Sequence, residues 1–359
     1  MKTKLLKTLS VILATLCVMG ITPVCSFAEE GEKTTFTMLD YNVAGLPDFK
    51  ALIGQSDGIS VDEKEKIIGK TLNETGIDFI AVQEDFNYNS DLVETMTNYE
   101  YKTIHSGGVP FGDGLNIYSK TPIYNIEREA WRKTYGVFIE GDQLTPKGIL
   151  YAVIEIADGV YADFYDIHAD AFDTQESQEA RVDNYNQLAE MIEKNGHTRP
   201  IIITGDFNVS LHLETYDISA VEMRKIFIDK LGMKDAWIEC CNNGNYNDFS
   251  EWETSGISYW GNWDSVEKFL YCDGGGIHLE AEDFEYINYG DDNIGLYSDH
   301  SAAKVTFSYE KTAEYSAPST DNLKAEKNHW FTKFFQNIGL FFKALWICLT
   351  NLGELKVYL

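Results

Sequence analysis

Three absences narrow the range of functions before any motif is considered. The six cysteines include no CxxC pair, so a structural zinc site is not expected. The chain has no GxSxG sequence, and no other serine or cysteine nucleophile motif stands out, which favours water as the nucleophile in a hydrolytic reaction. Positive charge is scarce, with 29 Lys and Arg against 57 Asp and Glu and a formal net charge of −28. Such a protein repels polyanions unless a cation or a local basic patch intervenes, so extended nucleic-acid binding is disfavoured.

The first 28 residues have the pattern of a secretory signal peptide. Lys2, Lys4 and Lys7 precede an apolar run over 11–21, and Ser26–Ala28 is a small-x-small cleavage site. We therefore expect a secreted, extracellular protein. Cleavage after residue 28 removes three lysines and no acid, so the formal charge becomes −31. An exported protein with an even number of remaining cysteines permits a disulfide, and the remaining ones are Cys240, Cys241, Cys272 and Cys348.

Residues 35–308 alternate short β-like runs with helical stretches, which predicts one α/β domain that is large for a single domain but within the range of two-layered β folds. No internal repeat is visible. The predicted strands are Phe36–Tyr41, Phe79–Gln83, Gly114–Tyr118, Gly148–Ile156, Val160–Ile167, Ile201–Thr204, Phe269–Cys272 and Ala302–Phe307. The predicted helices are Asp62–Thr75, Ser90–Thr97, Glu176–Glu193 and Ile218–Leu231.

After the domain the composition changes. Residues 309–329 are polar and without periodicity, which predicts a linker. Residues 330–352 place aromatic and aliphatic side chains at helical spacing, interrupted by Lys333 and Lys343, and the apolar run is shorter than the ~20 residues of a spanning helix. This pattern is typical of an amphipathic helix that lies on a membrane surface or binds a partner. A helix that packs back on the domain has the same pattern, so both interpretations stay open.

Several buried strands finish on polar residues. The segment IIITGDFNVS, residues 201–210, runs from three isoleucines into Gly205, Asp206 and Asn208, which are also ordinary turn residues. Similar endings place polar side chains at four other strands, namely Asn42, Gln83-Glu84, Asp166 with His168, and Asp299-His300. Because a sheet gathers such endings at one edge, where open α/β folds form their sites, we expect these side chains to lie close together.

This set of residues suits metal-assisted hydrolysis. Oxygen ligands such as Glu84 and Asn42 are those that Mg²⁺ prefers, and a bound ion neutralises a phosphate oxygen during in-line displacement. A histidine oriented by a carboxylate accepts a proton from water near neutral pH. Asp206 is placed to position that water, and Asn208 and His168 to donate hydrogen bonds to the developing charge.

With these residues identified, the chain resembles the endonuclease/exonuclease/phosphatase superfamily, which includes DNase I and neutral sphingomyelinases. The segments that carry the resemblance are YNVAGLP, AVQED, GDGLNIYSKTPI, DIHADA, GDFN and SDH, in family order across roughly residues 35–307. The resemblance implies a four-layered α/β/β/α sandwich and divalent-metal phosphoester hydrolysis, with Mg²⁺ as the expected ion and Mn²⁺ or Ca²⁺ as alternatives.

The resemblance also implies roles for individual residues. His300 is implied as general base, Asp206 as the residue that aligns water, and His168 and Asn208 as phosphate contacts. Metal ligation is implied for Glu84, Asn42, Asp299 and Glu267, with Asp299 also a candidate to orient His300. Asn116 and Asp166 are implied to bind substrate, although the family usually has Asn at the position of Asp166. For the acidic position before the strand that follows GDFN, Asp264 competes with Glu267.

A Lys147-Gly148 pair before a strand resembles the secreted neutral sphingomyelinase branch. Lys147 has the charge to meet a phosphodiester, and an ordinary turn explains the pair equally well. Aromatic residues over 131–143, with Trp260 and Trp263, are of the kind found at membrane interfaces or in a core. The leading hypothesis is therefore a secreted phosphodiesterase acting on a phospholipid headgroup. A nuclease or sugar-phosphate phosphatase is the first alternative, and a non-catalytic binding module the second.

Overall fold

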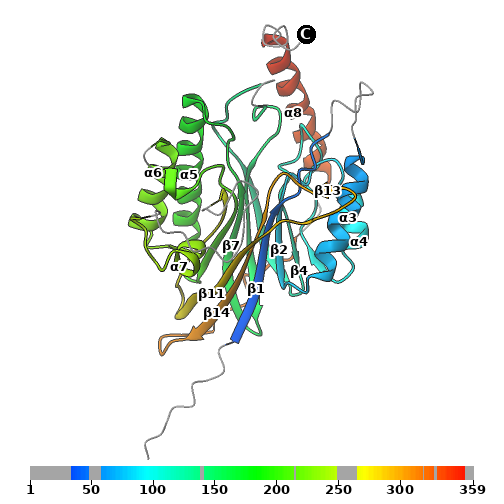
Figure 1. Cartoon of the computed structure of the whole chain (residues 1–359). Coiled ribbons are helices and arrows are strands. Elements are labelled where there is room, and N and C mark those ends of the chain that lie inside the picture. The colour runs from blue at the N-terminus through cyan, green and yellow to red at the C-terminus, as the bar shows by residue number, and fades with distance from the viewer. Residues whose placement is uncertain are drawn as a thin grey trace, which may run out of the picture. The chain divides into compact units, whose positions relative to one another are not determined.

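Two six-stranded sheets form the centre of the domain. The computed structural model describes residues 34–47, 58–137, 141–213, 216–248, 265–317, 319–326 and 330–351. The first sheet has the strand order β11-β14-β1-β2-β4-β3, and the second has the order β5-β6-β7-β8-β10-β9. Helices α3 and α4 cover the outer face of the first sheet, and α5, α6 and α7 cover that of the second (Figure 1). The predicted α/β/β/α sandwich is therefore confirmed.

The elements have the following bounds. The strands of the first sheet are β1 (Thr34–Asn42), β2 (Phe79–Gln83), β3 (Tyr101–Lys102), β4 (Asn116–Ser119), β11 (Ile277–Ile287) and β14 (Ala302–Lys311). Those of the second are β5 (Ile123–Ala130), β6 (Gly148–Ala157), β7 (Val160–His168), β8 (Ile201–Asp206), β9 (Lys234–Asp235) and β10 (Glu267–Cys272). A hairpin adds β12 (Gly290–Asp291) and β13 (Gly295–Leu296). The helices are α3 (Val61–Glu74), α4 (Asn89–Thr95), α5 (Gln175–Asn195), the short η1 (Leu211–Leu213), α6 (Ile218–Met223), the π-helical η2 (Arg224–Lys230), α7 (Ala236–Cys241) and α8 (Trp330–Thr350).

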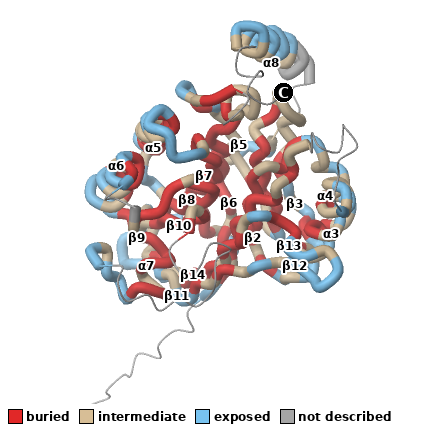
Figure 2. Tube along the Cα trace, turned by 45° about the horizontal axis from the view of Figure 1, so that its top comes forward, coloured by how far each residue is buried: buried red, intermediate tan, exposed pale blue. Residues whose placement is uncertain are grey.

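Period-two alternation decides which side chains of β1 face the second sheet. Phe36 and Met38 join the main core, which includes the space between the sheets, while Leu39 and Tyr41 pack with the helices α3 and α4. Asn42 follows Phe36 and Met38 at the same parity and therefore lies on the inter-sheet side. Figure 2 shows the result, with buried strands at the centre and exposed surface on the outer helices.

Two long strands were not predicted, and both are bulged edge strands. β11 lies at the edge of the first sheet and changes register between Ala281 and Asp283. β5 lies at the edge of the second and changes register between Tyr124 and Glu127. A bulge inserts one residue and breaks the alternation, and edge strands carry more charge than central ones, so the usual sequence signal is lost at both places.

The C-terminal helix is present as α8, within the predicted range 330–352. Its apolar side chains are largely exposed, among them Phe341 at 51%, Phe342 at 62% and Trp346 at 68%. Ile338, Phe341 and Phe342 line an apolar depression of about 370 Å³ together with Phe111. Among the described helices none combines the length and apolarity needed to cross a bilayer.

Some predictions fall outside the described residues, namely the signal peptide, Asp264, Trp260 and Trp263. Within the described part of the chain no disulfide joins Cys240, Cys241, Cys272 and Cys348.

Candidate active site

The register of the strands brings the predicted polar endings together. His168 at the end of β7 is paired with Asp206 at the end of β8, and Asp206 is in turn paired with Glu267 at the start of β10. In the first sheet Asn42 at the end of β1 is paired with Gln83, which precedes Glu84. One end of each sheet therefore contributes side chains to the same place.

Asn42 is the centre of the cluster. Its Nδ2 lies 3.2 Å from Glu84 Oε1, 3.1 Å from Asp206 Oδ2 and 3.4 Å from His300 Nε2. His168 Nε2 lies 3.3 Å from the same oxygen of Asp206. Five predicted site residues, separated by up to 258 positions, thus share one set of contacts.

The last turn of chain before the end of β8 needs a glycine, because Gly205 lies close to the neighbouring strand β7. Gly205 has φ of 132°, and a Cβ at this position would lie 2.0 Å from the carbonyl oxygen of Ile167. The next residues alternate in direction: Asp206 faces the histidines, and the ring of Phe207 packs in the core near Tyr185. Asn208, at φ 53°, donates from its backbone N–H to Asp206 Oδ1 at 2.9 Å. The turn is therefore built to hold the Asp206 carboxylate in place.

Glu267 contacts His300 directly. Its Oε1 lies 2.5 Å from His300 Nδ1, and its other oxygen accepts a hydrogen bond from Ser265 Oγ. Burial lowers the pKa of His300, but the hydrogen bond and charge of Glu267, with the charges of Asp206 and Asp299, outweigh it and raise that pKa to about 10. The oriented ring therefore directs Nε2 at the cluster and holds a proton strongly.

Asp299 has a different position. It is 70% exposed, and its Oδ1 lies 4.0 Å from His300 Nε2, on the opposite side of the ring from Glu267. The SDH segment itself is fixed to β1, because Ser298 Oγ donates to the carbonyl oxygen of Asn42 at 2.7 Å and accepts from the backbone N–H of His300 at 3.1 Å.

Lys147 reaches the same region as half of a buried ion pair. Its Nζ lies 2.6 Å from Asp142 Oδ1, and the two side chains are 6% and 2% exposed. Desolvation lowers the pKa of Lys147, but Asp142, Glu84 and Asp206 more than compensate and raise it. Nζ also donates to the carbonyl oxygen of Ala169 at 3.4 Å. Lys147 is thus a fixed positive charge beside the cluster.

The other two predicted substrate-binding residues lie in buried hydrogen-bond networks below the cluster. Asn116 Nδ2 donates to Asp85 Oδ2 at 2.9 Å, next to Glu84 in sequence. Asp166 Oδ1 accepts from Gln83 Nε2 at 2.7 Å, and the same amide donates to Asp40 Oδ1 at 2.7 Å. The bond between Gln83 and Asp166 links the two sheets, whereas Asn116 bonds within the first sheet to the residue that follows Glu84. Both residues therefore support the cluster through buried hydrogen bonds.

Sequence reasoning did not select Asp142, Ser265 or Asp40, although Asp142 and Ser265 contact predicted site residues and Asp40 shares the Gln83 amide with Asp166. Asp142 and Ser265 lie on loops with no strand-end signal, and only the fold brings them to Lys147 and Glu267. Asp40 had a usable signal, because it shares the inter-sheet face of β1 with Asn42. Trp131, which had two interpretations, is 6% exposed and donates from Nε1 to the carbonyl oxygen of His168 at 2.6 Å.

The donor set of the cluster fits a hard divalent cation. Glu84 has a left-handed backbone, with φ 60°, and desolvation raises the pKa of its carboxyl group. Desolvation also raises the pKa of Asp206, and it lowers that of His168 well below its usual value. No three His, Cys, Asp or Glu side chains among the described residues enclose a metal ion. Mg²⁺ keeps several waters and uses one or two carboxylates, so an open site led by Glu84 has the chemistry it requires.

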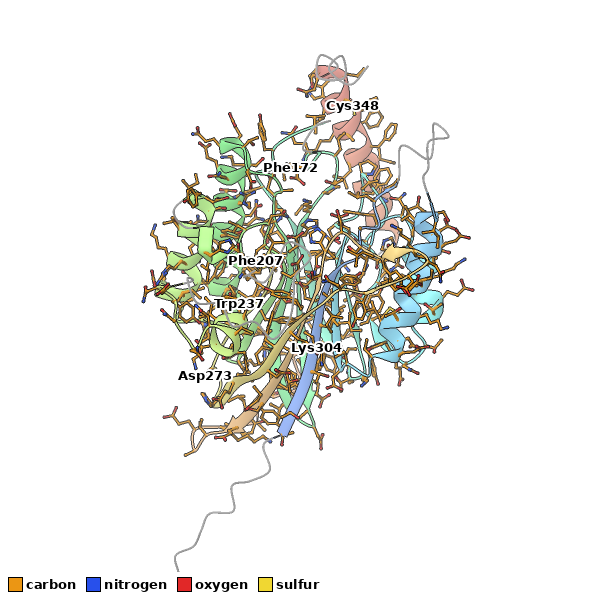
Figure 3. The ribbon with its side chains drawn as sticks, viewed as in Figure 1. Phe172, Phe207, Trp237, Asp273, Lys304 and Cys348 are labelled. Atoms are coloured by element: carbon orange, nitrogen blue, oxygen red, sulfur yellow. The ribbon has the colours of Figure 1, made fainter. Side chains whose placement is uncertain are left out.

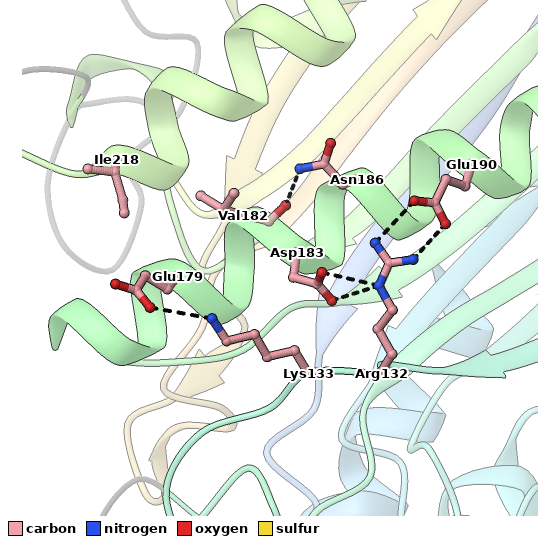
Figure 4. Close-up of a pocket in the computed structure, with 8 residues that line it drawn as sticks. All are labelled: Arg132, Lys133, Glu179, Val182, Asp183, Asn186, Glu190 and Ile218. Atoms are coloured by element: carbon pink, nitrogen blue, oxygen red, sulfur yellow. Dashed lines mark hydrogen bonds and ion pairs between the residues drawn. The ribbon is translucent and has the colours of Figure 1, made fainter.

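Two neighbouring surface cations, Arg132 and Lys133, are neutralised by acids on α5. Arg132 lies in an open surface pocket against α5, where Nε contacts Asp183 at 2.9 Å and Nη1 contacts Glu190 at 2.6 Å (Figure 4). Lys133 pairs with Glu179 at 3.4 Å in the same pocket. Arg132 and Lys133 therefore offer no unpaired positive charge for a nucleic-acid backbone.

Comparison with known proteins identifies the class. The sequence profile of the Endonuclease/Exonuclease/phosphatase family matches residues 41–265, so the chain belongs to this family of phosphoester hydrolases. The particular relatives are sphingomyelinases. The chain is 30% identical over 288 residues to the sphingomyelinase of Mycobacterium tuberculosis, covering 76% of this chain and 53% of that protein, and the Mycobacterium bovis sphingomyelinase gives the same values. The chain thus spans about half the length of the curated relatives it matches.

Solved structures support the fold. Beta toxin from Staphylococcus aureus, with bound magnesium ions, has a TM-score of 0.54 at 16% identity, covering 76% of this chain and 99% of that one. D. rerio TDP2 complexed with a single-strand DNA product has a TM-score of 0.54 at 14% identity, with the same coverage. The family resemblance read from the motifs, including its sphingomyelinase-like branch, is confirmed.

Proposed function

We propose that this protein is a secreted, divalent-metal-dependent phosphodiesterase that hydrolyses a phospholipid headgroup, as a sphingomyelinase does. The observation that carries the proposal is the convergence of Asn42, Glu84, Asp206, His168 and His300 on one another at the ends of two sheets. A binding module has no need of this arrangement of carboxylates and histidines. The similarity to mycobacterial sphingomyelinases supports a phospholipid as the substrate.

In this mechanism Glu84 and Asn42 would hold Mg²⁺, with Mn²⁺ and Ca²⁺ as alternatives, and Asp299 and Glu267 remain candidates. The ion would supply positive charge to the phosphate oxygens as negative charge develops. In the present rotamer Asn42 turns its NH₂ group toward Glu84 and its oxygen toward the backbone N–H of Ala44, 3.0 Å away. Ligation through that oxygen therefore requires a flip of the amide.

The protein's own groups then move the proton. Asp206 accepts a hydrogen bond from the attacking water and aligns it with the phosphorus. In its unprotonated form His300 accepts the proton at Nε2, and the Glu267 carboxylate 2.5 Å from Nδ1, which raises the pKa of His300, stabilises the imidazolium that forms. His168 stays neutral because burial lowers its pKa, so Nε2–H is a donor beside Asp206. Lys147 supplies positive charge and Asn208 a hydrogen-bond donor, while Asn116 and Asp166 support the site through their buried hydrogen bonds.

Charge favours a lipid headgroup over nucleic acid. The chain has a net charge of −28, and Arg132 and Lys133 are paired with acids. A phosphocholine headgroup is zwitterionic and meets no such repulsion, whereas a DNA backbone needs a run of unpaired cations. The same metal site would serve a nuclease or a sugar-phosphate phosphatase, which are therefore the outcomes against which the proposal is tested.

The test compares three substrates. Purified protein with Mg²⁺ is incubated with sphingomyelin vesicles, plasmid DNA and bis(p-nitrophenyl) phosphate, beside His300→Ala and Asp206→Asn. We expect release of phosphocholine that is lost in both variants, while their circular dichroism spectra match the wild type. If DNA is nicked and the lipid stays intact, the proposal is wrong and the protein is a nuclease. Inactivity on all three substrates would favour a binding module.

Two further parts of the proposal concern location. Residues 1–28 would direct export and be removed, which N-terminal sequencing of the protein from culture medium tests directly. α8 would lie on a membrane surface, since Phe341, Phe342 and Trp346 expose more than half of their side chains to solvent. Vesicle co-sedimentation of the full chain and of a chain ending at Glu326, which keeps β14 intact and removes α8, tests this role, and equal binding by the two would exclude it.

A further inference from the structure

Phe172 combines two uncommon properties, because its side chain is exposed and its backbone is left-handed. It lies in the loop between β7 and α5, has φ of 67°, and keeps 49% of its surface exposed. A bulky residue at positive φ is a clear outlier, since its Cβ crowds the following carbonyl group. Such strain persists only where the surrounding structure fixes the conformation, and it is concentrated at functional positions.

A fully buried arginine fixes this loop. Arg181 on α5 is 0% exposed, and its Nη1 donates to the carbonyl oxygens of Asp170, at 3.1 Å, and of Phe172. Its Nη2 donates to Asp217 Oδ2 at 2.7 Å, and Nε donates to Ser219 Oγ at 2.9 Å. A buried guanidinium with these acceptors is costly to disturb, so the backbone of Phe172 is anchored from within the protein.

The other end of the loop is bonded to the active site. The carbonyl oxygen of Ala169, next to His168, accepts from Asn208 Nδ2 at 3.0 Å and from Lys147 Nζ at 3.4 Å. The backbone N–H of Ala171 donates to Asp142 Oδ2 at 2.7 Å. Buried polar side chains therefore hold the backbone of the loop at Ala169, Asp170, Ala171 and Phe172, while the Phe172 ring remains about half exposed.

The exposed ring lies at the active-site end of the sandwich. Figure 3 shows Phe172 at the end of the molecule opposite Asp273. Asp273 directly follows β10, whose first residue is Glu267 of the site and whose last is Cys272. Phe172 therefore projects from the same end as Glu267 and His300.

We propose that Phe172 is an interfacial anchor that enters the acyl boundary of a zwitterionic phospholipid surface beside the active site. This inference rests on the proposed phospholipid substrate and adds a specific point of attachment. Aromatic rings are favoured at the boundary of headgroups and hydrocarbon. The net charge of −28 disfavours binding to anionic lipid. A phosphocholine lipid surface has no net charge, so it is the surface that we expect Phe172 to enter. The anchored backbone holds the Phe172 ring toward solvent, where about half of its surface stays exposed.

The test uses a substitution that relaxes the backbone. Asn tolerates positive φ, so Phe172→Asn removes the ring and should leave the thermal unfolding temperature unchanged or higher. The control is Val221→Asn on α6, because Val221 is exposed to a similar extent, 46%. Phe172→Trp keeps an interfacial aromatic. Full-length proteins are compared in co-sedimentation with phosphatidylcholine/sphingomyelin vesicles in EDTA, which prevents turnover, and in hydrolysis of the same vesicles and of bis(p-nitrophenyl) phosphate with Mg²⁺.

We expect Phe172→Asn to bind vesicles about fivefold to tenfold more weakly, from the apolar area of half a ring, and to lose vesicle hydrolysis by a similar factor. Hydrolysis of the soluble diester should stay within about twofold of wild type, and Phe172→Trp and Val221→Asn should behave as wild type. Equal vesicle binding by Phe172→Asn and wild type would overturn the inference. So would equal losses in Phe172→Asn and Val221→Asn, or a parallel loss on the soluble diester. Because binding in EDTA needs no catalysis, failure of the proposed substrate appears separately, as vesicles that are bound and not hydrolysed.

Discussion

Replacement of Glu267 by Gln isolates the charge that His300 senses. The Glu267 oxygen is 2.5 Å from His300 Nδ1, and the two side chains are 1% and 18% exposed. Two charges about 4 Å apart in an effective dielectric near 20 interact by about 4 kcal/mol, which corresponds to about 3 pKa units. This agrees in size with the rise in the pKa of His300 to about 10. Gln has the same shape and still accepts the hydrogen bond from Nδ1, so the variant removes charge and preserves contact.

The expected result has a structural and a catalytic part. Without the Glu267 charge the pKa of His300 should fall by about 3 units, and hydrolysis with Mg²⁺ should fall by roughly 10²- to 10³-fold, because the imidazolium formed in the reaction loses its counter-charge. The raised pKa of His300 in the folded state contributes stability at pH below about 6.5, and this contribution is lost as pH rises toward 10. Wild type in EDTA should therefore lose stability over that range, and the variant should lose less.

The measurements are an NMR titration of the His300 ring in EDTA, denaturant unfolding at several pH values, and kcat on bis(p-nitrophenyl) phosphate with Mg²⁺. Glu267→Asp is the matched control, since it keeps the charge on a shorter side chain and should keep most of the raised pKa of His300. A titration midpoint of His300 that differs by less than one unit between wild type and Glu267→Gln would refute the reasoning.

Three further predictions concern stability. Gly205→Ala should destabilise the protein severely, by more than about 3 kcal/mol, because its Cβ would lie 2.0 Å from the Ile167 carbonyl oxygen; expression and thermal melting test it. Lys147→Met should lower the free energy of unfolding in urea by about 3–5 kcal/mol, because it leaves the buried Asp142 carboxylate without its counter-charge. Adding Asp142→Asn should restore much of this loss, and additive losses in the double variant would contradict the prediction. His212 has a pKa lowered to about 4, mainly by burial, so the folded state resists its protonation and stability falls as pH drops from about 6.5 to 4. His212→Gln should flatten that fall by on the order of 1 kcal/mol after allowance for solvent screening, as measured by urea unfolding at pH 7 and pH 4.5.

Local pattern was sufficient where a strand is central and regular. The strand Phe79–Gln83 was predicted with the bounds that the structure has, because five consecutive buried residues lie between polar ones. The predicted helix Ile218–Leu231 is also present, although its second half widens into η2. The bulged edge strands β5 and β11 were missed because an inserted residue shifts the side chains of the rest of the strand to the other face.

Most residues of the candidate site could be identified from the sequence, but the contacts between them could not. Glu267 was expected as a metal ligand and Asp299 as the residue that orients His300, whereas the described contact to Nδ1 comes from Glu267. The metal roles of both residues stay predictions. Asp142 had no signal at all, since a single acid in a loop says nothing about a lysine five residues later.

The sequence by itself indicated the regular strands, the polar residues at their ends, and the membership of the motifs GDFN and SDH in a phosphoester hydrolase family. These properties depend on residue type and on spacing along the chain, which a sequence states directly. Only the tertiary structure decided that Asn42 meets Asp206 across 164 residues and that Glu267 meets His300 across 33. Such contacts depend on sheet register and on the packing of one sheet against the other. A shift of one residue in either sheet would turn the same side chains away from one another.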